Sequence, residues 1–292
     1  MKVFSPLPWG VKKITNLSSA IRFEHTLFAL PFAYIGMILA NNELPSAREF
    51  AWITVAMASA RTIAMTLNRI AHAREDASNP RTRNRHIPKG IITKRELLIL
   101  MLFSGVIFVF ASYQLNNLAF LLSPVAIFIL VLYTYAKYFT WACHFILGLA
   151  DGIAPVGAWL AITGTVEPKA LLLAWVVTLW IGGFDIVYAC LDRDFDKRFG
   201  IHSVPARFGI KNALLTTRVM HSAAAACLLI FGLWMNFGSY YYIGWVMIVA
   251  LLAFQNYIVK PHDLRRAGTT ALKINIYIGL ALILVTSLEV FL

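Results

Sequence analysis

The chain has 292 residues, of which 59% are hydrophobic and 14% are charged, and its mean hydropathy is +0.70. Soluble domains carry about 25% charged residues, so this composition excludes an ordinary soluble fold and predicts a protein that crosses a membrane many times. The net charge of +12 does not indicate nucleic-acid binding, because the basic residues fall in short loops between apolar segments.

Nine apolar segments follow one another along the chain, and most are long enough to cross a bilayer as a helix of about 20 residues. In chain order they span residues 24–40, 49–67, 97–115, 118–136, 141–163, 170–190, 213–236, 240–259 and 272–291. No change of composition marks a second folded unit, so we expect residues 1–292 to form one all-α membrane bundle. The first segment lacks a small-residue cleavage site, so we expect it to be the first span rather than a signal peptide.

The distribution of lysine and arginine predicts the orientation of the chain. If the N-terminus is cytoplasmic, 22 of the 26 basic residues fall on the cytoplasmic side. Loops on that side of a membrane are enriched in positive charge. We therefore expect an integral protein of the inner (cytoplasmic) membrane, with its N-terminus in the cytoplasm and its C-terminus outside.

The first polar cluster follows the second apolar segment. Asn68, His72 and Asp76 are four residues apart, so they share one face of a continuous helix. A basic segment containing Arg81 and Arg85 comes next. Carboxylates are costly near hydrocarbon, and those found there usually face a cavity and hold a positive group. The pattern therefore indicates a binding site open to the cytoplasm.

The second polar cluster follows the sixth apolar segment. Asp185 begins it, and Tyr188, Asp192 and Asp196 follow at offsets of 3, 7 and 11 residues, which place all four on one helical face. Further cations near the two clusters are Arg74, Lys89, Arg193, Lys197, Arg198 and Arg207. The two clusters lie on the same predicted side of the membrane, so we expect them to form a single site.

The residue types in this predicted site suit a metal ion and a diphosphate. Mg²⁺ prefers one or two carboxylates together with phosphate oxygens and water, and guanidinium groups bind phosphate bidentately. Such a clamp stabilises a leaving diphosphate. Each charge taken singly is better interpreted as a juxtamembrane ion pair, but two sets at helical spacing favour the site. Glu75 and Asp194 fall off the two faces and are interpreted as solvated neighbours.

A third polar stretch, residues 133–159, lies between the two clusters. Its three glycines allow close helix packing in a bilayer. Lys137 and Asp151 are harder to explain by packing, because a charge within a membrane span marks a candidate functional site.

These three stretches together resemble the UbiA-type intramembrane aromatic prenyltransferases. The first family motif, NxxxDxxxD-like with a following RTxxRP-like segment, is matched by Asn68, His72, Asp76, Arg81-Thr82 and Arg85-His86-Ile87-Pro88. The second, YAxxDxxxD-like, is matched by Tyr188-Ala189, Asp192, Asp196, Gly200 and Ser203. The intervening YxxxKxxTxxxHxxLGxxxGxxP-like segment is matched by Tyr133, Lys137, Thr140, His144, Leu147-Gly148, Gly152 and Pro155.

The resemblance implies about nine transmembrane helices around a central cavity, with a lateral opening for a lipid tail. It implies that Mg²⁺ and the diphosphate of a polyprenyl donor are held by Asn68, Asp76, Asp192 and Asp196, the three aspartates acting in catalysis together with Lys137. The implied substrate-binding residues are Arg22, Asn68, His72, Arg81, Arg85, Tyr133, His144, Asp185, Tyr188 and Arg207. Among these, Arg22 would lie near the carboxylate of the aromatic acceptor.

The implied reaction is the transfer of a polyprenyl group to a small aromatic acid. Loss of diphosphate leaves an allylic cation, which the apolar cavity shields from water until an electron-rich phenolic ring attacks it. The NRI, DASNPRT and IHSVPARFG stretches look most like the 4-hydroxybenzoate polyprenyltransferase-like branch, which serves ubiquinone or, with a dihydroxynaphthoate acceptor, menaquinone biosynthesis. Haem or a lipid alcohol are alternative acceptors, because they share the donor site.

One position departs from the family pattern, since His72 stands where the family usually has aspartate. A neutral imidazole is a poor ligand for Mg²⁺ and prefers softer metals. Three explanations stay open: the remaining oxygens suffice, His72 donates directly to phosphate, or the affinity for metal is lowered.

Two other functions fit the sequence less well. A CDP-alcohol phosphotransferase needs an Ala-Arg pair after its Asp-Gly, and none follows Asp151-Gly152 at the expected distance. A cation or metabolite transporter usually holds its ion near the bilayer midplane, whereas these clusters run into basic cytoplasmic loops.

Overall fold

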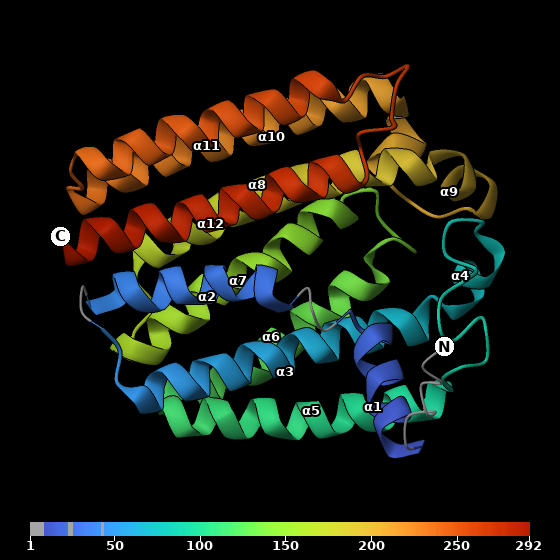
Figure 1. Ribbon diagram of the computed structural model, residues 1–292, viewed down its shortest axis with the longest axis horizontal. Coiled ribbons are helices and arrows are strands. Elements are labelled where there is room, and N and C mark those ends of the chain that lie inside the picture. The colour runs from blue at the N-terminus through green and yellow to red at the C-terminus, as the bar shows by residue number, and fades with distance from the viewer. Residues whose placement is uncertain (1–8, 23–25, 42–43) are drawn as a thin grey trace, which may run out of the picture.

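A computed structural model describes residues 9–22, 26–41 and 44–292. The described chain is built from helices, in agreement with the predicted all-α class (Figure 1). The helices are α1 (Trp9–Ala20), α2 (Thr26–Asn41), α3 (Ala47–Ala71), α4 (Ala73–Ser78), α5 (Lys94–Leu115), α6 (Asn117–Ala136), α7 (Cys143–Thr163), α8 (Pro168–Ala189), a 3₁₀ turn (Cys190–Asp192), α9 (Arg193–Phe199), α10 (Val204–Met235), α11 (Ser239–Ile258) and α12 (Thr269–Phe291).

Eight of the described helices are long and apolar enough to cross a membrane, namely α3, α5, α6, α7, α8, α10, α11 and α12. The apolar part of α2, Leu30–Ala40, is shorter. These helices coincide with the nine predicted segments to within a few residues at most ends. The exception is α10, which begins at Val204 rather than near residue 213, because Ser203 caps it and Pro205 occupies its first turn.

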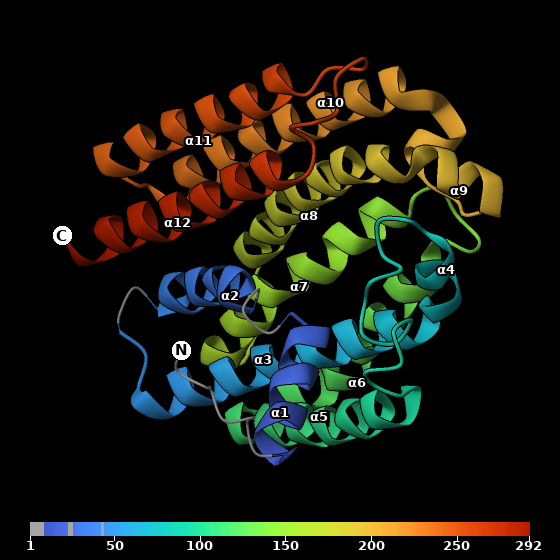
Figure 2. The same ribbon diagram turned by 45° about the vertical axis from the view of Figure 1, so that its right-hand side comes forward.

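The helices form two groups that meet along α7 and α8. On one side α10 packs against α8, α11 against α10 and α12, and α12 against α2 (Figure 2). On the other side α3, α5 and α6 pack against one another and against α7. Glycines of α7 and α2 make the contacts between helices close. A Cβ atom on Gly148 would overlap the backbone carbonyl of Thr178 in α8, and one on Gly36 would overlap that of Pro155. The predicted packing role of the α7 glycines is confirmed for Gly148.

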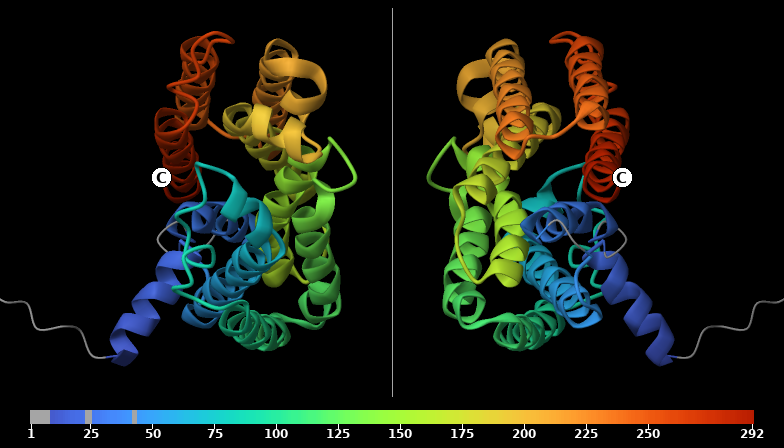
Figure 3. Two further views of the ribbon diagram at one scale, coloured as in Figure 1. Left: turned by 90° about the vertical axis from the view of Figure 1, so that its right-hand side faces the viewer. Right: turned by 90° about the vertical axis from the view of Figure 1, so that its left-hand side faces the viewer.

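Both polar clusters reach the same end of the bundle. The short helices α4 and α9 lie together there (Figure 1), and the segment of residues 79–92 crosses this end beside α4, as the left view of Figure 3 shows. The sequence-based expectation that the two clusters open to one side is therefore met by the fold.

The helix that carries the first motif is interrupted at His72. The backbone of His72 has φ −98° and ψ 19°, and it separates the end of α3 at Ala71 from the start of α4 at Ala73. The second motif is interrupted as well, by the 3₁₀ turn between α8 and α9. Helical hydrogen bonds continue across the first interruption, from the amide of His72 to Asn68 and from that of Asp76 to His72. Each motif is therefore bent rather than straight, and its residues keep an approximately helical course.

The close contact between α7 and α8 can be tested with two glycines of the same helix. We expect Gly148→Ala to destabilise the protein by about 1–3 kcal/mol, because the added methyl group overlaps a backbone carbonyl that cannot move away freely. Gly157→Ala is the matched control, since a Cβ there meets nothing within 4 Å. Thermal unfolding in detergent measures both, and equal melting temperatures would contradict this description of the interface.

Candidate active site

A polar cavity of about 220 Å³ lies at the end of the bundle that carries α4 and α9. All three predicted polar stretches contribute to its wall. Of the residues predicted for the site, it is lined by Asn68, His72, Asp76, Arg81, Arg85, Tyr133, Lys137, His144, Asp185, Tyr188, Asp192 and Asp196. Arg22 and Arg207 are not among its lining residues. Arg22 is exposed at the end of α1, and Arg207 lies in the first turns of α10.

The carboxylate of Asp76 is paired with an arginine from the same half of the chain. Asp76 is only 6% exposed, and Nη1 of Arg85 lies 2.6 Å from its Oδ1 and 2.8 Å from its Oδ2. The hydroxyl of Thr82 donates to the backbone carbonyl of Asp76, over 3.1 Å. These bonds fold residues 79–92 back over α4.

The carboxylate of Asp192 joins the two halves of the chain. Nε of Arg81 donates to its Oδ1 over 2.9 Å, and Nη2 of Arg81 contacts Oδ2. The side-chain amide of Asn79 donates to the same Oδ1 over 3.0 Å. The guanidinium of Arg81 also lies over the ring of Tyr188, 5.2 Å from its centre. Nη1 of Arg81 donates to the hydroxyl of Tyr188 over 3.4 Å. The segment that follows the first motif is thus bound to the second motif by four hydrogen bonds and a cation–π contact.

Lys137 and Asp196 complete the charged wall of the cavity. The hydroxyl of Ser203 donates to Oδ2 of the buried Asp196 over 2.9 Å. The backbone carbonyl of Lys137 accepts from the amide of His202 over 2.8 Å, which ties the loop after α6 to the loop after α9. Burial lowers the pKa of Lys137, while the nearby carboxylates of Asp196 and Asp76 oppose that shift. Lys137 is therefore a cation held among acids.

His144 positions Asp185 by a hydrogen bond whose direction is fixed. The backbone N–H of Val204 donates to Nε2 of His144 over 3.2 Å, so the proton of the neutral ring is on Nδ1. Nδ1 lies 2.6 Å from Oδ2 of Asp185. His144 therefore contributes to the site by holding the carboxylate of Asp185 and the start of α10 in place.

His72, Tyr138 and Glu75 form a second hydrogen-bonded group on the cavity wall. The hydroxyl of Tyr138 lies 2.7 Å from Nδ1 of His72 and donates to Oε1 of Glu75 over 3.0 Å. Burial, followed by the charge of Lys137, lowers the pKa of His72 to about 3, so its ring is neutral at pH 7. The interpretation of Glu75 as a solvated neighbour is wrong, since it lines the cavity. Asp194, 90% exposed, is solvated as expected.

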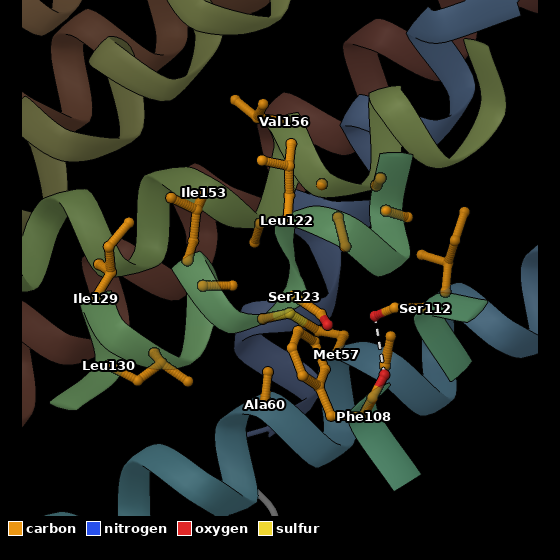
Figure 4. Close-up of a pocket in the computed structure, with 18 of the residues that line it drawn as sticks. Met57, Ala60, Phe108, Ser112, Leu122, Ser123, Ile129, Leu130, Ile153 and Val156 are labelled. Carbon is orange, nitrogen blue, oxygen red and sulfur yellow. Dashed lines mark hydrogen bonds between the residues drawn. The ribbon is translucent and has the colours of Figure 1, made fainter. Parts of the chain in front are cut away.

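An apolar chamber of about 250 Å³ adjoins this polar end, between α2, α3, α5, α6 and α7 (Figure 4). Tyr133 lies between the two spaces. It lines the polar cavity, where its hydroxyl lies 3.4 Å from the amide nitrogen of Asn68. It also packs against a hydrophobic cluster that includes Phe108, Leu130 and Ala150 of the chamber wall. The chamber has the size and lining of a binding site for a hydrocarbon group.

Two charged side chains face this apolar chamber, Arg61 from α3 and Asp151 from α7. The buried Nε of Arg61 has no hydrogen-bond partner within the described part of the protein. The candidate status of Asp151 followed from its sequence position, whereas Arg61 was overlooked as a site residue. The available signal was the same for both, namely a charge in the middle of an apolar segment.

The donor set of the polar cavity fits Mg²⁺ chemically. Asp76, Asp192 and Asp196 offer hard carboxylate oxygens and Asn68 an amide oxygen, as Mg²⁺ prefers. Within the described residues, no three His, Cys, Asp or Glu side chains stand close enough to share one ion. The reason is visible in the ion pairs, because arginines occupy the oxygens of two of the aspartates.

Comparison with known proteins gives consistent matches. A family model described as the UbiA prenyltransferase family matches residues 29–277. The 4-hydroxybenzoate octaprenyltransferase of Vibrio cholerae serotype O1 is 27% identical over 275 residues, which cover 94% of each chain.

Two solved structures share the fold. The apo structure of a UbiA homologue from Aeropyrum pernix K1 has 28% sequence identity and a TM-score of 0.82, covering 89% of this chain and 96% of that one. A UbiA homologue from Archaeoglobus fulgidus bound to GPP and Mg²⁺ has 18% identity and a TM-score of 0.73, covering 95% and 100%. The second likeness is one of fold alone.

The pair between Arg85 and Asp76 yields a stability prediction. We expect Arg85→Gln to lower the melting temperature in detergent, because it leaves a buried carboxylate without its cation. The loss should be smaller than the about 3–5 kcal/mol of a fully buried pair, since the side chain of Arg85 is 26% exposed. Arg83→Gln removes the same charge from an exposed neighbour and serves as the control. If Arg85→Gln and Arg83→Gln have the same melting temperature, the pair of Arg85 and Asp76 does not stabilise the fold.

Proposed function

Because the chain belongs to the UbiA prenyltransferase family, we propose that it transfers a polyprenyl group from polyprenyl diphosphate to a hydroxylated aromatic carboxylic acid. The observation that supports this most directly is the juxtaposition of a charged cavity with an apolar chamber, joined at Tyr133. The proposed acceptor is 4-hydroxybenzoate or a dihydroxynaphthoate, in ubiquinone or menaquinone biosynthesis. The relative from Vibrio cholerae is named for the first of these acids.

The diphosphate of the donor belongs in the polar cavity. Lys137 offers a point charge there, and Arg81 and Arg85 offer guanidinium groups that can form paired hydrogen bonds with phosphate. The residues that would hold Mg²⁺ are Asn68, Asp76, Asp192 and Asp196. When bound, this ion supplies positive charge that stabilises the departing diphosphate.

Donor binding requires the two arginines to change partners. In the structure, Arg81 holds Asp192 and Arg85 holds Asp76, so the carboxylates are neutralised internally. In the donor complex we propose that both guanidinium groups turn to the phosphate oxygens, and that the freed carboxylates face the metal. The exposure of both arginines, about a third and a quarter of their side chains, leaves them room to move.

The chemistry then proceeds between the two spaces. The bond between the allylic carbon and the diphosphate oxygen breaks, and the electron pair leaves with the diphosphate. The allylic cation is shielded from water by the apolar lining of the chamber. The aromatic ring attacks this carbon, a carbon–carbon bond forms, and the ring proton leaves.

The carboxylate of the acceptor needs a cation on the apolar side of the reacting carbon. Arg61 faces the chamber, and its buried Nε is unpartnered within the described residues. Asp151 lies near enough to interact electrostatically with Arg61, but the Nε–H of Arg61 is left without an acceptor within the described residues. A carboxylate of the substrate would supply that acceptor. We therefore propose Arg61 for this role beside Arg22, which the family resemblance implies.

The bundle is an integral membrane protein by its apolar helices. We propose that the end carrying α4 and α9 faces the cytoplasm, because lysines and arginines are concentrated in the segments at that end. A polyprenyl donor would then keep its tail in the bilayer and its diphosphate at the cytoplasmic surface.

Labelled polyprenyl diphosphate tests the proposed activity. The purified protein, offered 4-hydroxybenzoate or 1,4-dihydroxy-6-naphthoate, should form a prenylated acid with Mg²⁺ and none with chelator. Asp192→Asn should reduce the rate at least about 100-fold, since the developing diphosphate charge loses its support. Asp194→Asn, an equal charge change on an exposed carboxylate, should keep activity. Absence of product with both acids would contradict the proposal and make transport assays in vesicles the next step.

The acceptor site can be tested separately by steady-state kinetics. We expect Arg61→Gln to raise the KM for the aromatic acid about 10- to 100-fold, the value of a hydrogen bond to a charged group, with little change in the KM for the donor. Arg22→Gln, made in parallel, tells the two candidates apart. A rise in KM for Arg22→Gln alone would remove Arg61 from the acceptor site.

A further inference from the structure

The first motif lacks one carboxylate, and the structure contains another beside it. Residue 72 is histidine in the position where the resemblance leads one to expect aspartate. Glu75 lines the polar cavity together with Asp76. It follows Asn68 by seven residues, which is two helical turns, so helical periodicity places both side chains on the same side.

Glu75 is held on the cavity wall by one oxygen only. Its Oε1 accepts a hydrogen bond from the hydroxyl of Tyr138 over 3.0 Å. Its Oε2 is buried and has no hydrogen-bond partner in the described part of the chain. A buried, unpartnered carboxylate oxygen costs free energy unless something positive or a proton donor meets it. The free oxygen therefore indicates a place for a ligand.

The hydrogen bonds also show what His72 does. The hydroxyl of Tyr138 lies 3.0 Å from Oε1 of Glu75 and 2.7 Å from Nδ1 of His72, so it links the two side chains. The His72 ring also hydrogen-bonds the backbone of Thr134. His72 is thus held on the cavity wall by its protein neighbours, and it holds Tyr138 in turn.

From this geometry we infer that Glu75 supplies the carboxylate that the first motif lacks at residue 72, and that it takes part in holding the divalent cation of the donor complex. Tyr138 is the residue that positions Glu75, and His72 in turn holds Tyr138. This inference rests on the proposed function and assigns one more residue to the same site.

The test measures cation binding without turnover. The full-length protein in detergent is mixed with farnesyl thiolodiphosphate, a donor analogue that keeps its diphosphate, and titrated with Mn²⁺, whose free form is followed by electron paramagnetic resonance. Glu75→Gln should weaken Mn²⁺ binding at least about tenfold, and Tyr138→Phe by a comparable factor through loss of the positioning bond. Asp194→Asn, at an exposed carboxylate beside the second motif, is the control for charge and should bind as the wild type does.

A rescue variant separates ligation from a structural role. His72→Asp restores a carboxylate at the family position, so in the Glu75→Gln background it should recover most of the lost Mn²⁺ affinity. A general loss of folding would not be repaired in this way, and melting temperatures of all variants are recorded alongside.

The outcomes separate this inference from the proposed function. Unchanged affinity in Glu75→Gln, or a loss that His72→Asp fails to recover, would overturn the inference while leaving the wild-type site intact. If the wild type itself bound no Mn²⁺ with the analogue, the two-motif site would fail, and the assignment of Glu75 would fail with it.

Discussion

The cost of removing carboxylates from water at the end of a membrane-embedded bundle governs the arrangement of this site. A charged group removed from water needs a partner close by, or it destabilises the fold. Asp76 and Asp192 are each met by an arginine, Asp185 by His144, and Asp196 by the hydroxyl of Ser203. Glu75 is met at one oxygen and left free at the other.

These pairings also organise the chain around the site. The loop after α4 is bound to Asp192 of the second motif through Arg81 and Asn79. On the opposite wall, Lys137 is joined to the loop after α9 through a backbone hydrogen bond with His202. Segments from both halves of the chain are therefore held in place by the same few charged residues. A substitution at one of these residues would affect both the stability of the fold and the binding site.

Hydropathy was sufficient to locate the nine apolar segments, because each of these helices carries a long run of apolar side chains that face either the protein interior or the lipid. The motif spacing was sufficient to bring Asn68, Asp76 and Asp192 into one cavity, since helical periodicity holds over short distances. The interpretation of Glu75 as a solvated neighbour failed although Glu75 follows Asn68 by two helical turns and therefore shares its side of the helix. The contact of Glu75 with Tyr138 joins residues more than sixty positions apart, which the spacing within one motif does not predict.

Arg61 was missed for a different reason. A single cation in a membrane span has the same sequence signature whether it reaches the lipid surface or faces an internal chamber. Only the packing of α3 against α5, α6 and α7 distinguishes the two cases, and hydropathy does not report that packing.

The pairing of arginines with motif carboxylates has a consequence for the order in which ligands can be accepted. A diphosphate arriving without its cation would draw Arg81 and Arg85 away and leave Asp192 and Asp76 as facing, uncompensated anions. A bare cation would take the two carboxylates and leave two guanidinium groups without counter-charge. Only the metal and the diphosphate together exchange both sets of partners at once. Under the proposed function, the empty site thus discriminates against each half of its ligand, and after reaction it favours the release of the diphosphate and the ion together.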